Sequence, residues 1–266
     1  MMQTNKVSFS EAKSKLLIPL ILVALAVPGV ALAADASPVT ANVSLTSNYL
    51  YRGITQTGAK PAIQGGFDYA HASGIYAGAW GSNISWLGDF GAASAASLEL
   101  DTYAGFKGSL AEGFSYDVGF LRYNYPGIYP AGATKPDTNE IYGALGWKWL
   151  TAKYSRSISN LFGVANSSGS SYIDLSGSYT LEEPGITLGA HYGKQTFSGT
   201  GNDALTYSDY KLSASKDFSG YVVGLAYSST NTKKGLGEVW NIAGLPDGSN
   251  IDLGKSAVVV SVAHSF

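Results

Sequence analysis

The chain has 266 residues, with 17 basic and 19 acidic side chains that leave a formal net charge of −2 at pH 7. Only 14% of the residues are charged, against roughly 25% in an average soluble domain, whereas glycine (33) and tyrosine (18) are abundant. This composition excludes a nucleic-acid-binding surface, which needs clustered Lys and Arg, and the lack of any cysteine excludes disulfide bonds.

The first 33 residues have the layout of a secretory signal peptide. Three lysines precede an almost wholly apolar run over 16–30, and Ala31-Leu32-Ala33 supplies small residues at a cleavage site. The apolar run is shorter than the roughly 20 residues that a membrane helix needs. We therefore expect a signal peptide over 1–33 and one exported domain over 34–266. Without the three lysines and one glutamate of the first 33 residues, 14 basic and 18 acidic residues remain.

Alternation of apolar and polar residues with period two dominates the chain after Val39. Over Thr40–Ile54, apolar residues at 41, 43, 45, 49 and 51 oppose polar residues at 42, 44, 46, 48 and 52, as in a strand with one apolar face. A tilted strand of about 9–11 residues crosses a bilayer, and no segment after residue 33 is apolar enough for a membrane helix. The same alternation predicts further strands at about 62–71, 75–86, 96–107, 114–120, 140–149, 151–159, 171–181, 186–197, 206–218, 220–231 and 255–266.

The links between these strands alternate in length. Short links are expected at 72–74, 108–113, 150, 182–185 and 217–220, and longer ones at 87–94, 124–139, 160–170, 198–205 and 232–254, with 55–60 as a short exception. Bacterial outer-membrane barrels have short periplasmic turns, longer extracellular loops and an even number of strands. The sequence therefore predicts an all-β fold, a transmembrane antiparallel up-and-down β-barrel of about twelve strands.

Two arginines depart from the alternation, because Arg122 and Arg156 fall on the apolar faces of their strands. A lipid-facing Arg costs about 2–4 kcal/mol at the bilayer midplane and close to nothing near the interface. Either both residues lie near the outer rim and extend to the headgroups, or a bulge reverses the local alternation. The sequence leaves both alternatives open.

The last predicted strand ends in an aromatic residue. Phe266 shares a face with residues 258, 260, 262 and 264. A terminal aromatic on an alternating strand resembles the signal that the outer-membrane insertion machinery reads, although an ordinary soluble edge strand could also end in Phe. We expect this machinery as a partner through Phe266, and outer-membrane lipid and lipopolysaccharide around the barrel.

Several segments are shared with a known family. They include Tyr51-Arg52-Gly53-Ile54-Thr55-Gln56-Thr57, Pro61-Ala62-Ile63-Gln64-Gly65-Gly66-Phe67-Asp68-Tyr69 and Glu99-Leu100-Asp101-Thr102-Tyr103-Ala104-Gly105. From about Tyr49 to Ser159 the chain resembles the TorF family of porins. The resemblance implies an outer-membrane barrel that is termed a porin by analogy. It implies no particular substrate and no catalytic residues.

Polar residues on the inward parity of the predicted strands form the candidate site. Rings of charge select ions in channels, whereas paired charges can instead fill and stiffen a narrow lumen. The mixed signs argue against strong selectivity, and Glu99 and Asp101, which share one face of a strand, are the expected cation contact. The pore-lining candidates are Arg52, Asp68, Glu99, Asp101, Asp117, Glu140, Lys148, Asp174, Asp209 and Lys211.

Large aromatic residues are expected at the rims of the barrel, because amphipathic rings settle at the level of the headgroups. A sugar-binding track is the alternative interpretation. The rim candidates are Tyr49, Tyr51, Trp80, Trp86, Trp147 and Trp149.

The sequence disfavours an enzyme. Of the three histidines, only His191 has Asp and Ser residues in neighbouring strands, and no motif marks a nucleophilic serine. No pattern indicates a cofactor or a metal. We therefore predict a passive channel for small hydrophilic solutes or ions, narrowed by the loops 124–139 and 232–254. The alternative is a closed barrel that acts as a surface receptor, an adhesin or a lipid-modifying hydrolase.

Overall fold

The computed structural model describes residues 37–93, 95–235, 237–245 and 248–266. Twelve antiparallel strands close into one barrel, in which neighbours in sequence pair and the first strand pairs with the last. The barrel strands are β1 (Val39–Thr46), β4 (Ala62–Ala70), β5 (Ile75–Asn83), β6 (Leu98–Ser109), β7 (Phe114–Asn124), β8 (Thr138–Trp147), β9 (Leu150–Ser157), β10 (Ser171–Leu181), β11 (Ile186–Thr196), β12 (Tyr207–Phe218), β13 (Tyr221–Thr230) and β16 (Ala257–Ser265). The predicted twelve-stranded antiparallel barrel is confirmed. The predicted signal peptide, 1–33, lies outside the described residues.

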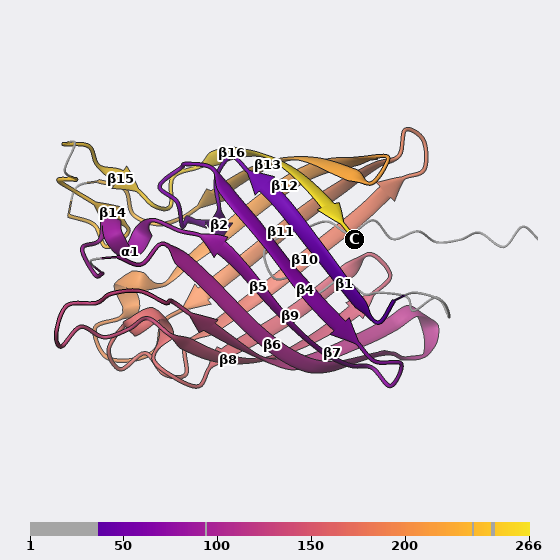
Figure 1. The fold of residues 1–266 in the computed structure, drawn as a ribbon, viewed down its shortest axis with the longest axis horizontal. Helices are drawn as coiled ribbons and strands as arrows, with labels where there is room; N and C mark the ends of the chain where they lie inside the picture. The colour runs from indigo at the N-terminus through magenta and orange to yellow at the C-terminus, as the bar shows by residue number, and fades with distance from the viewer. Residues whose placement is uncertain (1–36, 94, 236, 246–247) are drawn as a thin grey trace, which may run out of the picture.

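The two ends of the barrel differ. Long links over 47–61, 84–97, 125–137, 158–170, 197–206 and 231–256 gather at one end, and short turns over 71–74, 110–113, 148–149, 182–185 and 219–220 lie at the other end with the C-terminus (Figure 1). The first link is long rather than short, so the predicted exception at 55–60 is wrong. The long links carry α1 (Trp86–Asp89), the hairpin strands β2 (Leu50–Tyr51) and β3 (Ile54–Thr55), and the pair β14 (Asn241–Ile242) and β15 (Ile251–Asp252). No helix in the described ranges is long and apolar enough to span a membrane.

The outer surface of the barrel is apolar. Leu212 on β12 and Val258 on β16 are each 63% exposed, and large hydrophobic residues are exposed on every barrel strand. Soluble monomers rarely expose an apolar patch of more than a few hundred Å². The continuous ring of exposed apolar residues is therefore typical of a surface that faces lipid.

Aromatic residues border this apolar surface at the short-turn end. Most face outward near the short turns, and three more exposed tyrosines lie further along the strands towards the long links. Trp147 and Trp149 belong to the first group, as expected for rim residues. The first group is Tyr69, Phe114, Trp147, Trp149, Tyr179, Phe218 and Tyr221, and the second is Tyr154, Tyr210 and Tyr227.

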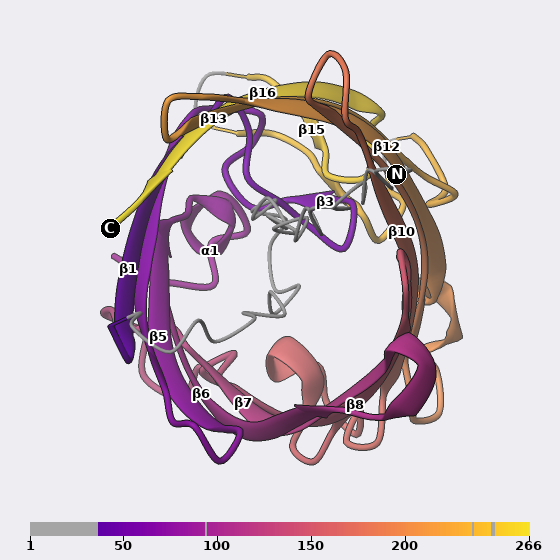
Figure 2. The same ribbon diagram turned by 90° about the vertical axis from the view of Figure 1, so that its right-hand side faces the viewer.

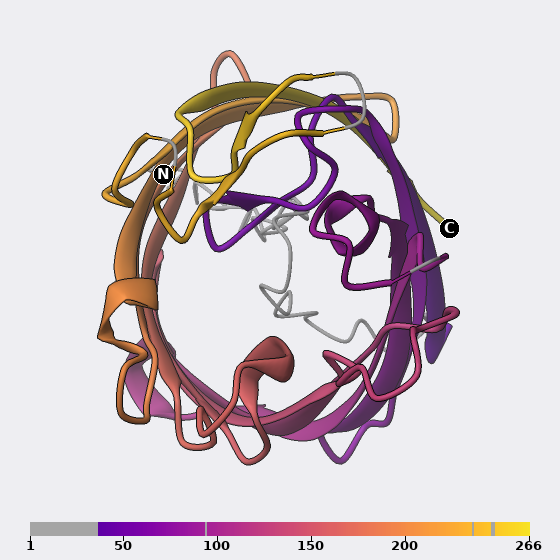
Figure 3. The ribbon, with the colours of Figure 1, turned by 90° about the vertical axis from the view of Figure 1, so that its left-hand side faces the viewer.

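The segment after Thr46 departs from the predicted first strand. Instead of continuing along the wall to Ile54, residues 47–61 fold into the barrel, where β2 and β3 form a hairpin (Figures 2 and 3). Tyr49 and Tyr51 are consequently buried inside rather than exposed at the rim. Trp80 also faces inward, since its ring packs edge-on against Tyr49, and Trp86 packs on Tyr125. Alternation locates the two faces of a strand, but it does not distinguish lipid from an aromatic interior.

The inner wall is built so that tyrosine rings can lie along it. The Tyr76 hydroxyl on β5 rests over Gly105 on β6, and the Tyr142 hydroxyl on β8 rests over Gly119 on β7. A Cβ atom at either glycine would overlap the tyrosine that covers it. Glycine at these strand positions permits close approach, so the rings fill the surface of the wall and extend less across the lumen.

We expect Gly105→Ala to destabilise the barrel by about 1–3 kcal/mol, the usual cost of overpacking. The new methyl group would displace Tyr76 from its hydrogen bonds with Asp117 and Tyr142, and it would lie 2.6 Å from the backbone oxygen of Val118. The measurement is urea unfolding in detergent. Gly143→Ala is the matched control, because the nearest atom to its added carbon is 3.9 Å away. Equal stability of the two variants would contradict this account of the wall.

The two arginines that break the alternation lie near the long-link end. The register of their strands is continuous, so a bulge does not reverse the alternation. Arg122 contacts the side chains of Asn124, Asn139 and Asp137, where it is 41% exposed. Arg156 is exposed beside Gly169. Both side chains therefore lie at the outer rim, the first of the two predicted alternatives.

Candidate functional site: the barrel lumen

Most of the predicted site residues point into the barrel. The strands place eight of them on the inner face, and Arg52 enters from the hairpin instead of from a wall strand. Lys148 is the exception, because it lies exposed in the turn between β8 and β9 with a φ of 53° and its ammonium over Trp147. The placement of Lys148 in the lumen is wrong, since the alternation ends at Trp147. The inward eight are Asp68, Glu99, Asp101, Asp117, Glu140, Asp174, Asp209 and Lys211.

The hairpin presents Arg52 at its tip. Arg52 and Gly53 link β2 to β3 with φ angles of 46° and 78°, and positive φ at both central residues is what a two-residue type I′ hairpin turn requires. A Cβ on Gly53 would lie 2.7 Å from Asp209 Cβ and Thr230 Cγ2. The hairpin tip is therefore seated tightly against β12 and β13.

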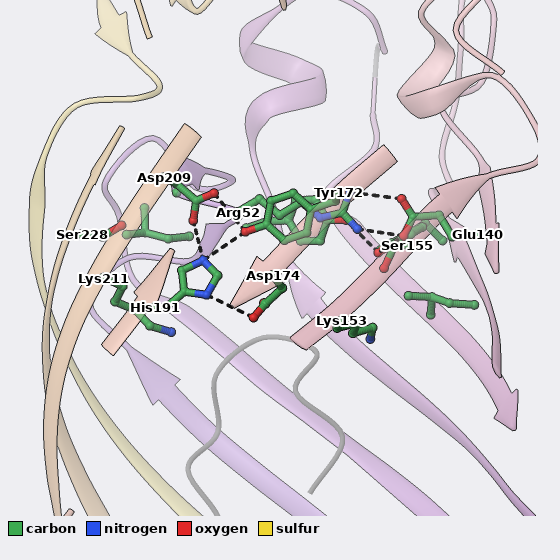
Figure 4. Close-up of a pocket in the computed structure, with 15 residues that line it drawn as sticks. Arg52, Glu140, Lys153, Ser155, Tyr172, Asp174, His191, Asp209, Lys211 and Ser228 are labelled. Atoms are coloured by element: carbon green, nitrogen blue, oxygen red, sulfur yellow. Dashed lines mark hydrogen bonds and ion pairs between the residues drawn. The ribbon is translucent and has the colours of Figure 1, made fainter. Parts of the chain in front are cut away.

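Arg52 bridges the lumen from this position. Its Nη1 and Nη2 donate to the two carboxylate oxygens of Glu140 at 3.1 and 2.8 Å (Figure 4). Nη1 also donates to Gln195 Oε1 at 2.6 Å. The guanidinium carbon lies 4.2 Å from the ring centroid of Tyr172 and 4.8 Å from that of Tyr51. Burial lowers the pKa of Arg52, but the Glu140 carboxylate raises it, and the result is a pKa well above the ordinary value. We call this contact the Arg52 latch.

A second polar network lies beside the latch on β10, β11 and β12. His191 Nε2 is 2.9 Å from Asp209 Oδ1, and His191 Nδ1 is 3.4 Å from Asp174 Oδ1. Tyr172 donates to Asp209 Oδ2 at 2.9 Å, so one carboxylate contacts both rings. Figure 4 shows these groups converging from neighbouring strands on one side of the lumen. Alternate positions on each strand share a face, which brings these groups together.

The pair Glu99 and Asp101 is enclosed instead of open to the lumen. Their exposed fractions are 1% and 0%, and Tyr49 donates to Glu99 at 2.8 Å. Burial raises the pKa of Tyr49 well above its ordinary value, so its hydroxyl stays protonated as a donor. Neither carboxylate oxygen of Asp101 has a hydrogen-bond partner in the described part of the chain. Both side chains face inward as expected, but they do not line open space.

Two apolar clusters occupy the long-link half of the lumen. The first packs α1 and the base of the hairpin against the wall, and the second lies between the hairpin and the other long links. The first cluster consists mostly of aromatic side chains, and their bulk limits the open space around the Arg52 latch. The first cluster includes Tyr49, Tyr51, Leu87, Leu121, Tyr123, Tyr125 and Tyr142, and the second includes Ile54, Leu161, Phe197, Tyr207, Ile242 and Leu253.

The network around His191 superficially resembles a catalytic triad. Ser176 Oγ lies 3.2 Å from His191 Nδ1, but this hydroxyl donates to Asp174. Acyl transfer also needs free donors aimed at a developing oxyanion, whereas the backbone of Ser176 lies within the paired strands β9, β10 and β11. No cluster of three or more possible metal ligands was found among the described residues. The arrangement offers polar contacts but no evident nucleophile.

Several lumen residues were absent from the predicted set. Lys107 lies over the Tyr76 ring at 5.0 Å, and Lys153 lies over the Tyr142 ring at 3.9 Å. His191 was expected only as a possible catalytic group. The alternation of apolar and polar residues places all three side chains on inward faces, so the same rule identifies them as lumen residues. The inward direction of the tyrosines on the wall could not be predicted in this way, since an amphipathic ring can lie on the lipid-facing or the lumen-facing side of a strand.

A family model described as a bacterial protein of unknown function, Gcw_chp, matches residues 31–266. The chain belongs to the Gcw_chp family. No curated protein matches the sequence. The matching model is Gcw_chp and not TorF, so the TorF resemblance stays a prediction.

Experimental structures similar to this Gcw_chp chain include a KdgM porin and the outer membrane protein OprD. A KdgM porin is 9% identical, with 86% of this chain and 98% of the porin covered and a TM-score of 0.47. A KdgM porin in complex with disordered oligogalacturonate is 10% identical, with 86% of this chain and 98% of the porin covered and a TM-score of 0.48. The outer membrane protein OprD from Pseudomonas aeruginosa is 14% identical, with 87% of this chain and 66% of OprD covered and a TM-score of 0.40.

Proposed function

We propose that the protein is an outer-membrane channel through which small hydrophilic solutes or ions diffuse passively. One observation carries the proposal: a closed barrel with an apolar, aromatic-bordered exterior surrounds a lumen rich in charged and hydroxyl groups. A β-sheet is stable in lipid only when every strand edge is paired, as it is in a closed barrel. A polar interior needs water or a polar solute as its neighbour unless its groups pair with one another.

The proposal extends to the surroundings of the barrel. Outer-membrane lipid and lipopolysaccharide would contact the exposed apolar residues, and the signal peptide over 1–33 would direct export. Phe266 is 74% exposed; its backbone pairs with that of Ala41, and its ring packs edge-on against His264. A terminal aromatic that is so accessible would be available to the insertion machinery.

A closed barrel is the second candidate, and the two apolar clusters favour it. About eight strands leave an interior that side chains just fill, and roughly sixteen leave an open channel. Twelve strands fall between these limits, so the size of the barrel alone does not decide. With the long-link half largely filled, a receptor, an adhesin or a lipid-modifying hydrolase is the alternative function.

Conductance of the purified, refolded protein in a planar lipid bilayer tests the proposal. We expect discrete steps of small conductance, because the latch and the apolar clusters narrow the lumen. Folded material should show the heat-dependent gel mobility of β-barrels and should fractionate with the outer membrane. Complete absence of conductance from protein that passes the mobility test would favour the closed barrel, and recovery as a soluble periplasmic protein would contradict both candidates.

A further inference from the structure

The inner wall has two unlike halves. The strands β5 to β11 direct tyrosine, lysine and acidic side chains inward, and several of these are large enough to reach the hairpin. The strands β12, β13, β16 and β1 present small uncharged groups below the hairpin, among them Ser213, Ser228, Ser261 and Ser44. Because these side chains project only a short way from the backbone, the wall that carries them leaves open space beside it. We call this the serine wall.

A cavity lies against the serine wall. Among its described lining residues Lys211 is the only charged one, and most of the polar side chains carry hydroxyl groups. A second cavity, shown in Figure 4, contains the latch and the His191 network. The two cavities share Leu50, Lys211 and Ser228. They therefore adjoin where Leu50 of the hairpin lies across from β12 and β13.

We propose that solutes pass along the serine wall and that the passage is narrowest between Leu50 and the pair Lys211 and Ser228. This inference rests on the proposed channel function and deepens it. It also excludes Glu99 and Asp101 from contact with the solute, because both are enclosed beneath the first apolar cluster.

The chemistry of this route indicates the class of solute. Serine hydroxyls both donate and accept hydrogen bonds, so they suit hydroxylated solutes without a fixed charge. At the narrow point the Lys211 ammonium offers donors and no acceptor. The nearby carboxylates already have partners: Glu140 contacts Arg52, and Asp209 contacts Tyr172 and His191. Asp174 in the same cavity contacts His191 and accepts a hydrogen bond from Ser176. The route therefore favours small hydroxylated solutes that are neutral or carry one negative charge, such as a carboxylate.

Single cysteines test the position of the route, because the chain has no cysteine of its own. Ser215→Cys and Ser261→Cys are placed on the serine wall, and Ser82→Cys is a matched control that also faces inward but is 2% exposed. We expect a negatively charged methanethiosulfonate reagent to reduce single-channel conductance at least twofold in the first two variants and to leave the third unchanged. Heat-dependent mobility shows that each variant is folded.

Reversal potentials under a KCl gradient test the role of Lys211. Lys211→Gln should shift the selectivity towards cations, and Lys211→Glu should shift it further, with the largest effect at low salt, where the Debye length reaches about 30 Å at 0.01 M. Lys216→Gln is the matched control, since it removes the same charge from the outward face of the same strand. We expect its reversal potential to equal that of the parent.

The outcomes separate the route from the channel function. A conducting parent whose Ser215→Cys and Ser261→Cys variants are unaffected by the reagent overturns the route. The same conclusion follows if Ser82→Cys is blocked equally, or if Lys211→Glu and Lys216→Gln give the same potential. A folded parent that does not conduct overturns the proposed function itself.

Discussion

Replacement of Arg52 by methionine is expected to destabilise the barrel by about 3–5 kcal/mol, the usual cost of breaking a buried ion pair from one side. The side chain of Arg52 is 8% exposed and that of Glu140 is 3% exposed, so Glu140 would remain as an uncompensated buried charge. The hairpin would also lose its contacts with Gln195 and with the Tyr172 ring. We therefore expect the hairpin to leave its position more often and single-channel conductance to increase severalfold.

Two further variants separate stability from channel narrowing. In Arg52→Met/Glu140→Leu both charges are absent, so most of the lost stability should return, because apolar replacement of a whole buried pair is often neutral. The latch would still be missing, so conductance should remain high. Arg122→Met removes an ion pair that is 41% and 28% exposed, and an exposed pair contributes about 0–1 kcal/mol.

Urea unfolding in detergent and single-channel recording are the two measurements. An Arg52→Met protein that unfolds at the same urea concentration as Arg122→Met would show that the latch does not stabilise the fold. Parent-like conductance in both Arg52 variants would show that the hairpin does not narrow the channel.

Placing an arginine on the outer surface should have a strongly position-dependent effect. Leu212 lies near the middle of β12, opposite Ala190 and Tyr227, and is 63% exposed. In a bilayer Leu212→Arg should cost about 2–4 kcal/mol, whereas an arginine near the interface should cost about 0–1 kcal/mol. Tyr221→Arg supplies that comparison, since Tyr221 begins β13 beside a short turn and is 55% exposed.

The measurement is the free energy of unfolding in lipid vesicles. Only a lipid-facing surface gives a large difference between the two sites. In a water-soluble barrel, an exposed Leu→Arg change should stay within about 0.5 kcal/mol of the parent, like most surface substitutions. Equal and small effects at Leu212 and Tyr221 would therefore rule out a membrane location for this surface.

The strands were predictable from sequence because each one crosses the same boundary between an apolar exterior and a polar lumen. β10 and β11 begin and end within a residue or so of their predicted limits. The predicted end of the first strand was wrong because the alternation continues through Tyr49 and Tyr51. The apolar neighbours of these two residues are aromatic side chains inside the barrel instead of lipid. The sequence Arg52-Gly53 between two short apolar segments did carry a hairpin signal, since Gly favours the positive φ of such turns.

The site was less predictable than the wall. Alternation identified which charged residues face inward, but it contains no information on pairing across the lumen. Arg52 and Glu140 are 88 residues apart, and Arg52 and Gln195 are 143 apart, so closure of the ring alone brings them together. Burial of Glu99 and Asp101 likewise depends on where the first link folds, which no local pattern of β6 reveals.

The position of the hairpin in the chain also has a consequence for the order of assembly. The hairpin leaves the wall directly after β1, which pairs with β16 to close the ring. Its tip contacts β8, β11, β12 and β13. Of these strands, β12 and β13 lie in the last quarter of the sequence. Contacts between distant parts of a chain form slowly. The hairpin can therefore dock only on a nearly complete cylinder, and a barrel whose seam has not yet closed would remain without its internal obstruction.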